Sequence, residues 1–542
     1  MNRAFAAAAA LIVTAVAGSL RADTRTIEMF PRENWWGAAN CYGSSMPFNA
    51  KTSLKIDLRK DGGSNQYASL MLSDKGRAIW CEEQAEFKIE GGKIRVTSDR
   101  NAPIELVEAG KTLRDAFLYA SKTWFPPSGK APDLLFFSAP QYNTWIELTY
   151  NQNQKDILAY AKSMIANGCP PGILMIDDTW QAGYGDWRFE PARFENPKAM
   201  MDELHALGFK VMLWMCPFVS MDTPSFRRIE RGIEPLTGRG LKERGGFLRN
   251  KDGKGPACVP WWNGYSALLD FTHPFAQKWF KGECDRLVRD YGADGFKFDG
   301  GHLPFYVRGL RSHKKDATGG EQVLGYAQFT LMYPACEYRN AWRFQGQGVV
   351  ERLNDKHHRW GDLRKLIPDM AAGGLLGHQF MCPDMIGGGE WNSFRPGAKI
   401  NQELFVRSAQ IHALCPMMQF SASPWRVLDK KNQQYVRDAV ALRMKFAPQI
   451  MRLAEECAKT GEPMLRNMEY CFPGMGYASI KDQFMLGDFL LVAPQIYGDA
   501  KDRKVSIPPG TWRADDGTTV KGPAVITVST PLSRLPYFVK EL

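Results

Sequence analysis

A lysine and an aspartate two residues apart close an apolar run at residues 292–301, Gly-Ala-Asp-Gly-Phe-Lys-Phe-Asp-Gly-Gly. If the run is a buried β-strand, Lys297 and Asp299 point to the same side, because side chains alternate along a strand. A lysine beside a carboxylate keeps the carboxylate ionised, which is the state that a nucleophile needs. Taken alone, the segment fits a surface strand end with an incidental ion pair equally well.

A second apolar run, residues 172–176, ends in the adjacent carboxylates Asp177 and Asp178. Neighbouring residues on a strand point to opposite faces, so we expect one of the two to enter a site and the other to brace the loop. Trp145 and Trp214 stand near neighbouring apolar runs. Flat aromatic rings suit the C–H faces of sugars, although a core position explains each tryptophan at least as well.

Strand-like runs alternate with amphipathic helical stretches between residues 131 and 450. Repeated β–α units indicate a parallel sheet, and this many units indicate an α/β fold with a closed (β/α)8 TIM barrel. The polar residues named above fall at the C-terminal ends of the strands, where the active sites of such barrels lie. We predict strands at 134–145, 172–176, 210–214 and 295–299, and helices at 154–167, 197–207 and 274–290.

The regions on either side of the barrel show a different pattern. Residues 23–130 consist of short alternating segments separated by glycine-rich turns, which predicts an N-terminal β-sandwich domain. Residues 451–542 return to strand-like runs with turns at 508–510 and 515–517, which predicts a C-terminal β-sandwich domain. A glycine- and charge-rich insertion at 217–262 interrupts the barrel of residues 131–450.

Residues 1–22 are typical of an export signal peptide. Arg3 precedes an alanine-rich apolar run, and Ala15-Val16-Ala17 forms a small-x-small cleavage site, with Ala22 as a second candidate. We therefore expect an exported protein, periplasmic or secreted if the source is bacterial. The run is too short to span a bilayer comfortably, and no later stretch is long and apolar enough, so we expect no membrane insertion.

The formal net charge of +11 comes without a lysine/arginine block or a nucleic-acid motif, so we expect a diffuse, solvating charge and no nucleic-acid partner. Eleven cysteines are scattered singly from Cys41 to Cys471 and cannot be paired from the sequence. The chain has no metal-binding, phosphate-binding or dinucleotide motif, so we expect neither a metal nor a cofactor. The oligomeric state, including a homo-oligomer, stays open.

Several motifs follow one another along the chain from about residue 140 to the C-terminus: 172–180, 194–214, 295–299, Pro-Asp-Met-Ile-Gly-Gly at 383–388, and 482–494. In this order they resemble the motifs of family 31 of the glycoside hydrolases. The details at 261–264, 297–299 and 418–421 resemble the branch with the animal myogenesis-regulating glycosidase and bacterial α-galactosidases. Gly-Gly-His at 300–302 departs from the acidic or Asn-Glu pair of the α-glucosidase branches.

The resemblance implies a retaining mechanism that uses two carboxylates. One attacks the anomeric carbon, and the other protonates the leaving oxygen and then acts as a base on water. The matching strand makes Asp299 the nucleophile. For the acid/base the resemblance favours Asp355, five residues before Trp360, over Asp362, which a favourable position at the start of a helix would also explain.

The resemblance also implies residues that bind the sugar. Asp177 would bind a pair of hydroxyls, Trp180 would form a wall near the substrate, and Arg352 matches an arginine of the same branch. Asp384 would bind a hydroxyl or orient the nucleophile loop, and Lys297 would lower the pKa of the nucleophile and contact a hydroxyl. The remaining candidates are the stacking platforms Trp145 and Trp214.

We therefore expect an exo-acting α-glycoside hydrolase whose partner is a carbohydrate with a terminal α-linked sugar, first of all an α-galactosidase. The same chemistry on α-glucosides, α-xylosides or a sulfonated glucose (sulfoquinovosidase) stays open. So does a transglycosylase, in which a sugar hydroxyl replaces water. An inactive carbohydrate-binding module is a further alternative, but it would have lost one carboxylate of the pair, and both are present.

Overall fold

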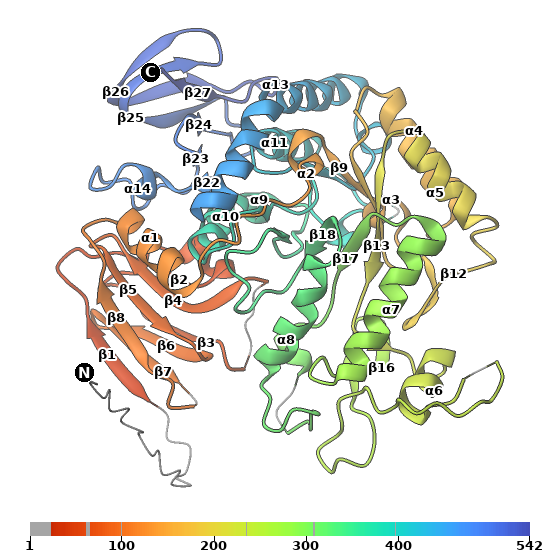
Figure 1. Ribbon diagram of the computed structural model, residues 1–542. Helices are drawn as coiled ribbons and strands as arrows, with labels where there is room; N and C mark the ends of the chain where they lie inside the picture. The colour runs from red at the N-terminus through yellow and green to blue at the C-terminus, as the bar shows by residue number, and fades with distance from the viewer. Residues whose placement is uncertain are drawn as a thin grey trace, which may run out of the picture.

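The computed structural model describes residues 23–60, 65–98, 100–234, 236–306, 309–395 and 397–541. The expected export signal at 1–22 therefore lies outside the described residues. Figure 1 shows an N-terminal part made of β-sheets, a central barrel surrounded by helices, and a C-terminal β-domain next to the long helix α13 (Lys430–Thr460).

Eight parallel strands form the barrel and are neighbours in the order in which they occur along the chain. The seam between the last two strands is bridged where the N–H of Ile386, beyond the seventh strand, donates to the carbonyl of Gln419, in the eighth strand, at 2.8 Å. The expected TIM barrel is confirmed. Its strands are β9 (Gln141–Asn143), β10 (Ile173–Ile176), β13 (Lys210–Met215), β17 (Gly295–Phe298), β18 (Ala335–Tyr338), β19 (Val350–Arg352), β20 (Met381–Cys382) and β21 (Gln419–Phe420).

The helices around the barrel begin where the sequence supplies caps. Asn153 and Asn196 accept a backbone N–H at the starts of α4 and α5, and Pro197 occupies the first position of α5. These two helices and α7 end within one residue of the predicted positions. The connection 339–349, between β18 and β19, contains no helix. The covering helices are α4 (Gln154–Ala166), α5 (Pro197–Ala206), α7 (Pro274–Tyr291), α8 (Gly319–Ala327), α10 (Leu366–Leu375) and α11 (Gln402–Ala413).

The strand predicted at 134–145 is wrong over most of its length. The strand β9 covers only Gln141–Asn143. The residues before it form the short helix α2 (Leu135–Ser138), and those after it form the short helix α3 (Trp145–Leu148). The run at 134–137 is apolar because Phe136 and Phe137 are fully buried. Four apolar residues do not distinguish a strand from a buried helical turn.

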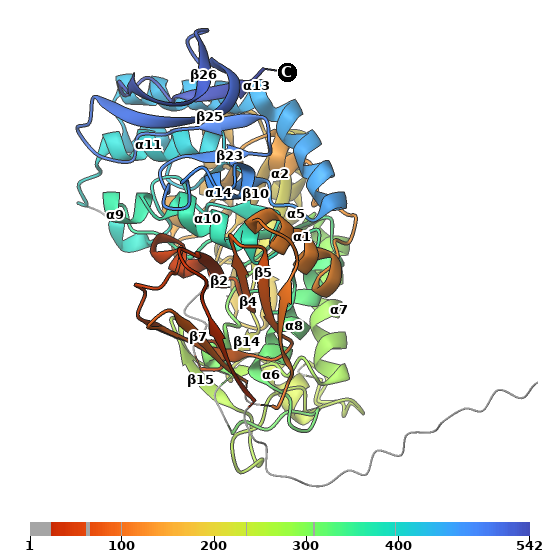
Figure 2. The same cartoon turned by 90° about the vertical axis from the view of Figure 1, so that its left-hand side faces the viewer.

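The N-terminal part contains two four-stranded antiparallel sheets. Figure 2, which is turned by 90°, shows these sheets in front of the barrel. Asn65 and Gln66, just before β4, both donate side-chain amide N–H groups to the Arg352 carbonyl, at 3.1 and 3.0 Å. The N-terminal part therefore contacts the barrel where a strand ends. The sheets are β1 (Thr24–Glu28), β7 (Lys93–Ser98), β6 (Ala85–Glu90) and β3 (Leu54–Asp57), and β2 (Trp35–Ala39), β4 (Tyr67–Ser73), β5 (Arg77–Cys81) and β8 (Ile104–Glu108).

The insertion after β13 folds into a small subdomain. It contains β14 (Phe218–Val219), α6 (Pro224–Arg231) and the hairpin of β15 (Cys258–Trp261) and β16 (Gly264–Leu268). The hairpin turn, Trp262-Asn263, reaches the end of the barrel where its strands terminate, since Trp262 and Trp214 of β13 line one pocket.

The C-terminal strands hydrogen-bond as one six-stranded antiparallel sheet, whereas we expected a sandwich of two sheets. The predicted turn at 508–510 lies inside a continuous strand, where it causes an irregularity in the pairing of β25 with β26. Among the described residues, no helix is both long and apolar enough to cross a membrane. The strands are β22 (Leu465–Arg466), β23 (Phe484–Leu486), β24 (Leu490–Val492), β27 (Tyr537–Lys540), β25 (Asp502–Ala514) and β26 (Thr519–Ser529).

Candidate active site

A pocket of about 220 Å³ opens at the C-terminal ends of the barrel strands. Seven of the nine predicted site residues line it, and the other two, Trp180 and Asp384, do not. The barrel brings these residues together because the carboxyl ends of all its parallel strands meet on one face. The lining consists of Trp145, Tyr150, Asp177, Asp178, Trp214, Trp262, Lys297, Asp299, Arg339, Arg352, Asp355, Met385, Gly389, Glu390 and Trp391.

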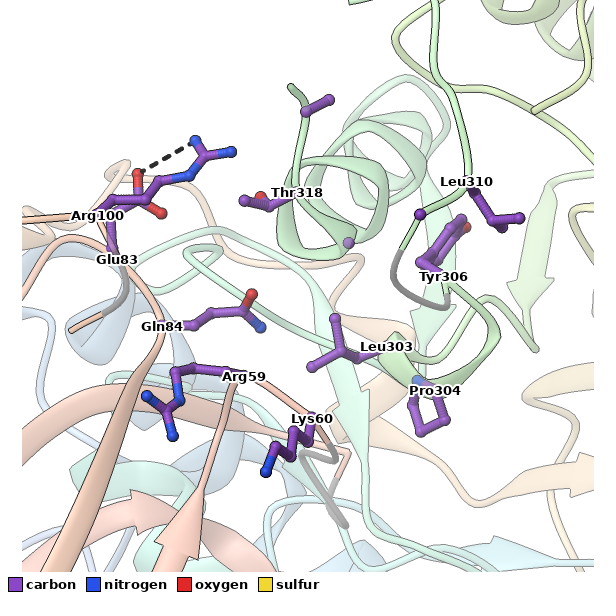
Figure 3. A pocket seen from close by; sticks show the side chains of 13 residues that line it. Arg59, Lys60, Glu83, Gln84, Arg100, Leu303, Pro304, Tyr306, Leu310 and Thr318 are labelled. Atoms are coloured by element: carbon purple, nitrogen blue, oxygen red, sulfur yellow. Dashed lines mark ion pairs between the residues drawn. The ribbon is translucent and has the colours of Figure 1, made fainter. Parts of the chain in front are cut away.

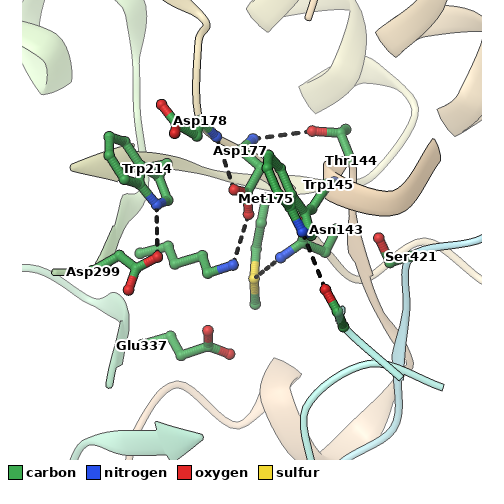
Figure 4. Close-up of polar contacts among 12 residues, drawn as sticks. Asn143, Thr144, Trp145, Met175, Asp177, Asp178, Trp214, Asp299, Glu337 and Ser421 are labelled. Atoms are coloured by element: carbon green, nitrogen blue, oxygen red, sulfur yellow. Dashed lines mark hydrogen bonds and ion pairs between the residues drawn. The ribbon is translucent and has the colours of Figure 1, made fainter. Parts of the chain in front are cut away.

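Asp299 directly follows β17, and hydrogen bonds fix its carboxylate. Its Oδ2 accepts from the indole N–H of Trp214 at 3.0 Å (Figure 4), and its Oδ1 accepts from the Gly300 N–H at 2.8 Å. Gly300 has a φ of +68°, and a Cβ atom there would lie 2.8 Å from the ring of Phe218. Only glycine lets the chain turn away at this position without strain. The Asp299 side chain is 9% exposed.

Two guanidinium groups are shared between Asp299 and Asp355. Arg339 contacts Asp299 Oδ1 at 3.1 Å and Asp355 Oδ2 at 3.3 Å. Arg352 contacts Asp355 Oδ1 at 2.8 Å and Asp299 Oδ1 at 3.5 Å. Burial alone would raise the pKa of Asp299, but Arg339, then Arg352 and then Lys297 hold it well below its usual value. Asp299 is therefore ionised at neutral pH, as a nucleophile requires.

The two candidates for the acid/base lie in different surroundings. Asp355 lines the pocket, and its side chain is 30% exposed. Burial raises the pKa of Asp355, but the two guanidinium groups lower it to about 2. Asp362 lies in the short helix α9 (Trp360–Leu363), outside the pocket lining, and accepts the His357 N–H at 2.9 Å. The structure thus places Asp355, and not Asp362, in the same pocket as Asp299 and in contact with the same two arginines.

Lys297 pairs with a different carboxylate from the one that the sequence suggested. Its ammonium lies 2.7 Å from Asp177 Oδ2, and both side chains are almost fully buried. Burial alone would lower the pKa of Lys297, but Asp177 raises it above its usual value. Among the cations that lower the pKa of Asp299, Lys297 follows Arg339 and Arg352. Lys297 is first of all the counter-ion of Asp177.

Asp177 and Asp178 both line the pocket, contrary to the expected division into an inward and an outward residue. The strand β10 ends at Ile176, so the alternation of a strand does not continue through them. Asp178 Oδ2 accepts from the Asn263 side-chain amide at 2.7 Å. Burial, and then the negative charge of Asp177, raise the pKa of Asp178 to about 7.

Two predicted site residues lie behind the pocket. Trp180 is fully buried, and its indole N–H donates to the Trp214 carbonyl at 2.9 Å, so the expected wall residue is a core residue. Asp384 is also buried and faces Arg352 Nη1 at 3.4 Å. Asp384 therefore contacts Arg352, the arginine that binds the carboxylates of Asp299 and Asp355. This position fits a role in orienting Arg352 better than contact with a sugar hydroxyl. Burial raises the pKa of Asp384 to about 7.

The sequence analysis missed Arg339 and three aromatic residues that line the pocket. Arg339 directly follows β18, whose sequence, Ala-Cys-Glu-Tyr, was not predicted to be a strand. The rule that functional residues follow barrel strands would have found Arg339 if that strand had been recognised. The aromatic residues, which come from loops and from the insertion, are Tyr150, Trp262 and Trp391.

A second cavity, of about 540 Å³, lies between the N-terminal part and the segment that follows β17 (Figure 3). Among the described residues that line it, Glu83 is the one carboxylate, and it faces Arg100 at 4.0 Å. Chemistry that needs a pair of carboxylates therefore fits the smaller pocket at the end of the barrel.

Comparison with known families identifies the class of this protein. The model of the glycosyl hydrolases family 31 TIM-barrel domain matches residues 140–323 and 339–453, and the family 31 C-terminal domain matches residues 461–541. The first match alone covers more than half of the chain. The chain belongs to glycosyl hydrolase family 31.

Relatives of known name agree with this assignment. The chain is 32% identical to the myogenesis-regulating glycosidase of Mus musculus over 79% of its own length and 60% of that protein, and 26% identical to an alpha-xylosidase of Emericella nidulans over 85% and 59%. It thus spans about three fifths of the length of these two relatives. The structure of a family 31 alpha-xylosidase from a soil metagenome, complexed with xylose, shares the fold, with a TM-score of 0.80, 20% identity, and coverage of 96% and 79%.

Proposed function

We propose that this chain is a retaining, exo-acting α-glycoside hydrolase. The observation that carries the proposal is the arrangement of Asp299 and Asp355, which face one pocket and share the guanidinium groups of Arg339 and Arg352. Two carboxylates on either side of a sugar are the machinery that glycoside hydrolysis needs. Membership of the family supports the same chemistry.

In the first step Asp299 attacks the anomeric carbon, and Asp355 protonates the leaving oxygen. The Trp214 and Gly300 N–H groups keep Asp299 in place for this attack. Asp355 is ionised in the open pocket, because its pKa is lowered to about 2. A sugar that covers Asp355 removes water from it, and desolvation raises the pKa of a carboxyl group. Substrate binding itself thus favours the protonated form that donates.

In the second step Asp355 removes a proton from the water that hydrolyses the glycosyl ester. Once Asp299 is esterified, its negative charge no longer raises the pKa of Asp355, while Arg339 and Arg352 still lower it. Asp355 is therefore held as a carboxylate, the form that a general base requires. The same residue serves as acid and then as base because the charge on its neighbour changes between the steps.

The pocket favours a single neutral sugar. Its volume of about 220 Å³ lies below the roughly 300–1,000 Å³ of sites for drug-sized ligands, which suits one ring and hence an exo mode of action. Each of the three cations in the lining, Lys297, Arg339 and Arg352, faces a carboxylate. These ion pairs favour a neutral sugar over the sulfonated alternative, since the cations are already engaged.

Two sugars have separate support. The motifs at 261–264, 297–299 and 418–421 favour an α-galactoside, whereas the name of the Emericella nidulans relative favours an α-xyloside. The test is hydrolysis of nitrophenyl α-galactoside, α-xyloside and α-glucoside, with Asp299→Ala as the inactive control. NMR of the first product should show the α-anomer, and formation of the β-anomer would refute the retaining mechanism. Analysis of products at high sugar concentration separates hydrolysis from transglycosylation.

The expected export signal makes a periplasmic or secreted location part of the proposal. Sequencing the N-terminus of the protein from the periplasm and medium of a bacterial host tests it. A start after Ala17 or Ala22 is the expected result, and an uncleaved protein confined to the cytoplasm would contradict it.

A further inference from the structure

Much of the positive charge of the chain is concentrated in two short segments, whereas we expected it to be diffuse. Residues 223–254 of the insertion contain nine basic and four acidic residues, and residues 309–315 contain three basic residues and no acidic one. The surplus of eight positive charges in these segments compares with a formal net charge of +11 for the whole chain. The proposed chemistry uses none of these residues.

The two segments lie side by side. The Arg249 N–H donates to the Arg311 carbonyl at 2.8 Å, and the Arg311 N–H donates back to the Arg249 carbonyl at 2.9 Å. The Arg311 side chain also donates to the Lys251 carbonyl at 3.0 Å. The helix α6 belongs to the same surface, because the Gly245 N–H donates to the Ile229 carbonyl at 2.7 Å. Figure 1 and Figure 2 both show α6 at the end of the molecule opposite the C-terminal domain.

Most cations of this surface have no anionic partner. Three of the four acidic residues in the first segment each pair with one cation, in the pairs Glu230–Arg249, Glu234–Arg228 and Glu243–Lys278. Within the part of the chain that the structure describes, nine exposed cations of the two segments form no ion pair. We call these nine residues the basic surface: Arg227, Arg231, Arg239, Lys242, Arg244, Lys251, Lys254, Arg311 and Lys315. Like charges without counter-ions repel one another and attract an anionic partner.

Apolar side chains stand among these cations. Leu236 is 93% exposed and Ile233 is 37% exposed, and Arg231 and Arg239 lie on either side of them in the chain. An antiparallel bridge between Ile233 and Gly240 closes this loop, so that Leu236 stands at its tip. A leucine that stays almost entirely in water contributes no hydrophobic stabilisation to the fold.

The combination of cations with an exposed apolar tip distinguishes one anionic partner from another. An anionic polymer, such as a sulfated polysaccharide, offers negative charges but no apolar phase for a leucine. The surface of an anionic lipid bilayer offers both. Its headgroups attract lysine and arginine, and the boundary between headgroups and acyl chains accepts apolar side chains.

We propose that the basic surface, together with Leu236, is a peripheral docking site for an anionic lipid membrane. The cations bind the lipid headgroups, and Leu236 enters the boundary beneath them, while no segment crosses the bilayer. None of these residues lines the pocket of the proposed active site. The docking site is therefore independent of the proposed glycosidase activity and would hold the protein at a membrane.

Flotation of the full chain with lipid vesicles tests the docking site. We expect binding to vesicles of equal parts phosphatidylcholine and phosphatidylglycerol, and none to vesicles of phosphatidylcholine alone. The variant Lys242→Gln/Lys251→Gln/Lys254→Gln should bind the anionic vesicles roughly a hundredfold more weakly, because each cation near an anionic surface contributes about fivefold. Binding should also weaken as salt is added, since salt screens exposed charges.

A matched control separates the position of the charges from the net charge. Lys501, Lys504 and Lys521 are exposed lysines of the C-terminal domain, at the opposite end of the molecule from α6. Lys501→Gln/Lys504→Gln/Lys521→Gln changes the net charge by the same amount and should bind anionic vesicles as the wild type does. Equal weakening in the two triple variants would overturn the docking site, and so would wild-type binding to neutral vesicles as tight as to anionic ones.

Leu236→Ser tests the apolar contact. It should weaken binding to anionic vesicles by about tenfold, because the burial of one leucine side chain is lost. The control Val525→Ser replaces a valine of β26 that is 67% exposed, and it should leave binding unchanged. Unchanged vesicle binding by Leu236→Ser, or wild-type binding to dextran sulfate but not to anionic vesicles, would show a polymer site and overturn the membrane proposal.

Discussion

Replacement of Asp355 or Asp362 by alanine distinguishes the catalytic carboxylate from a carboxylate that stabilises a helix. Asp355 faces Asp299 across two shared guanidinium groups, whereas Asp362 accepts the His357 N–H and pairs with Arg359 and Lys365. The two residues are seven positions apart, carry the same functional group and receive the same substitution. Any difference between the variants therefore reports the position of the carboxylate.

The expected losses are of different kinds. Asp355→Ala removes general acid/base catalysis, which typically contributes about 10²–10⁴-fold, or roughly 3–5 kcal/mol of barrier. Asp362→Ala removes a first-turn carboxylate that accepts a backbone N–H, and the loss of such a hydrogen bond typically costs about 0.5–1.5 kcal/mol of stability. We therefore expect Asp355→Ala to lose disaccharide hydrolysis at a nearly unchanged Tm, and Asp362→Ala to keep most activity at a lowered Tm.

Azide provides the decisive assay. An α-glycosyl fluoride needs no proton donor in the first step, so Asp355→Ala still forms the glycosyl ester on Asp299 and then stalls, because water lacks its base. Azide needs no base, so it should restore turnover and yield the α-glycosyl azide. Rescue of Asp362→Ala but not of Asp355→Ala would refute our assignment. A β-glycosyl azide from Asp355→Ala would refute the ester intermediate.

Three further substitutions test the electrostatics and the core. Arg339→Ala should raise the pKa of Asp299 and so move the acid limb of the kcat/KM profile with a glycosyl fluoride to higher pH, and an unmoved limb contradicts the role of Arg339. The pKa of Asp384, raised to about 7, lies above the usual value of about 3.9, so the contribution of Asp384 to stability should fall as pH rises between these values. In urea unfolding, the stability of Asp384→Asn should therefore fall less steeply over this range than that of the wild type, and parallel curves would contradict the raised pKa. Trp180→Phe should lower the free energy of unfolding by roughly 1–3 kcal/mol, because a hydrogen bond and buried volume are lost, while KM stays unchanged. A raised KM at unchanged stability would show instead that Trp180 contacts the substrate.

The sequence predicts those parts of the site that follow recognisable apolar runs. Asp177 and Asp299 each come directly after an apolar run, and a barrel brings such positions together on one face. Arg339 follows β18, and no helix separates that strand from the next, so the repeating β–α pattern is lost there. The sequence pattern therefore does not predict Arg339, which lowers the pKa of Asp299 more than any other cation.

Burial could not be predicted for individual tryptophans. Trp180 and Trp262 both stand in family motifs, yet one is fully buried and the other is 45% exposed at the mouth of the pocket. The difference arises because Trp180 packs under β13, while Trp262 lies at the tip of an insertion whose path is set by tertiary contacts. Local sequence contains neither fact, since each depends on residues more than thirty positions away.

The hydrogen bonds from Asn65 and Gln66 to the Arg352 carbonyl bear on how the chain acquires its activity. These two residues are synthesised nearly three hundred positions before the strand that they support, and the Asn65 N–H also reaches Asn354, next to Asp355. The Ala341 N–H, in the connection without a helix, donates to the Asn65 carbonyl at 2.8 Å. The barrel alone would thus lack the contacts that hold the segments next to Asp355. We therefore expect a fragment without the N-terminal sheets to lose activity, because the proposed active site is completed only when these distant parts of the chain have docked.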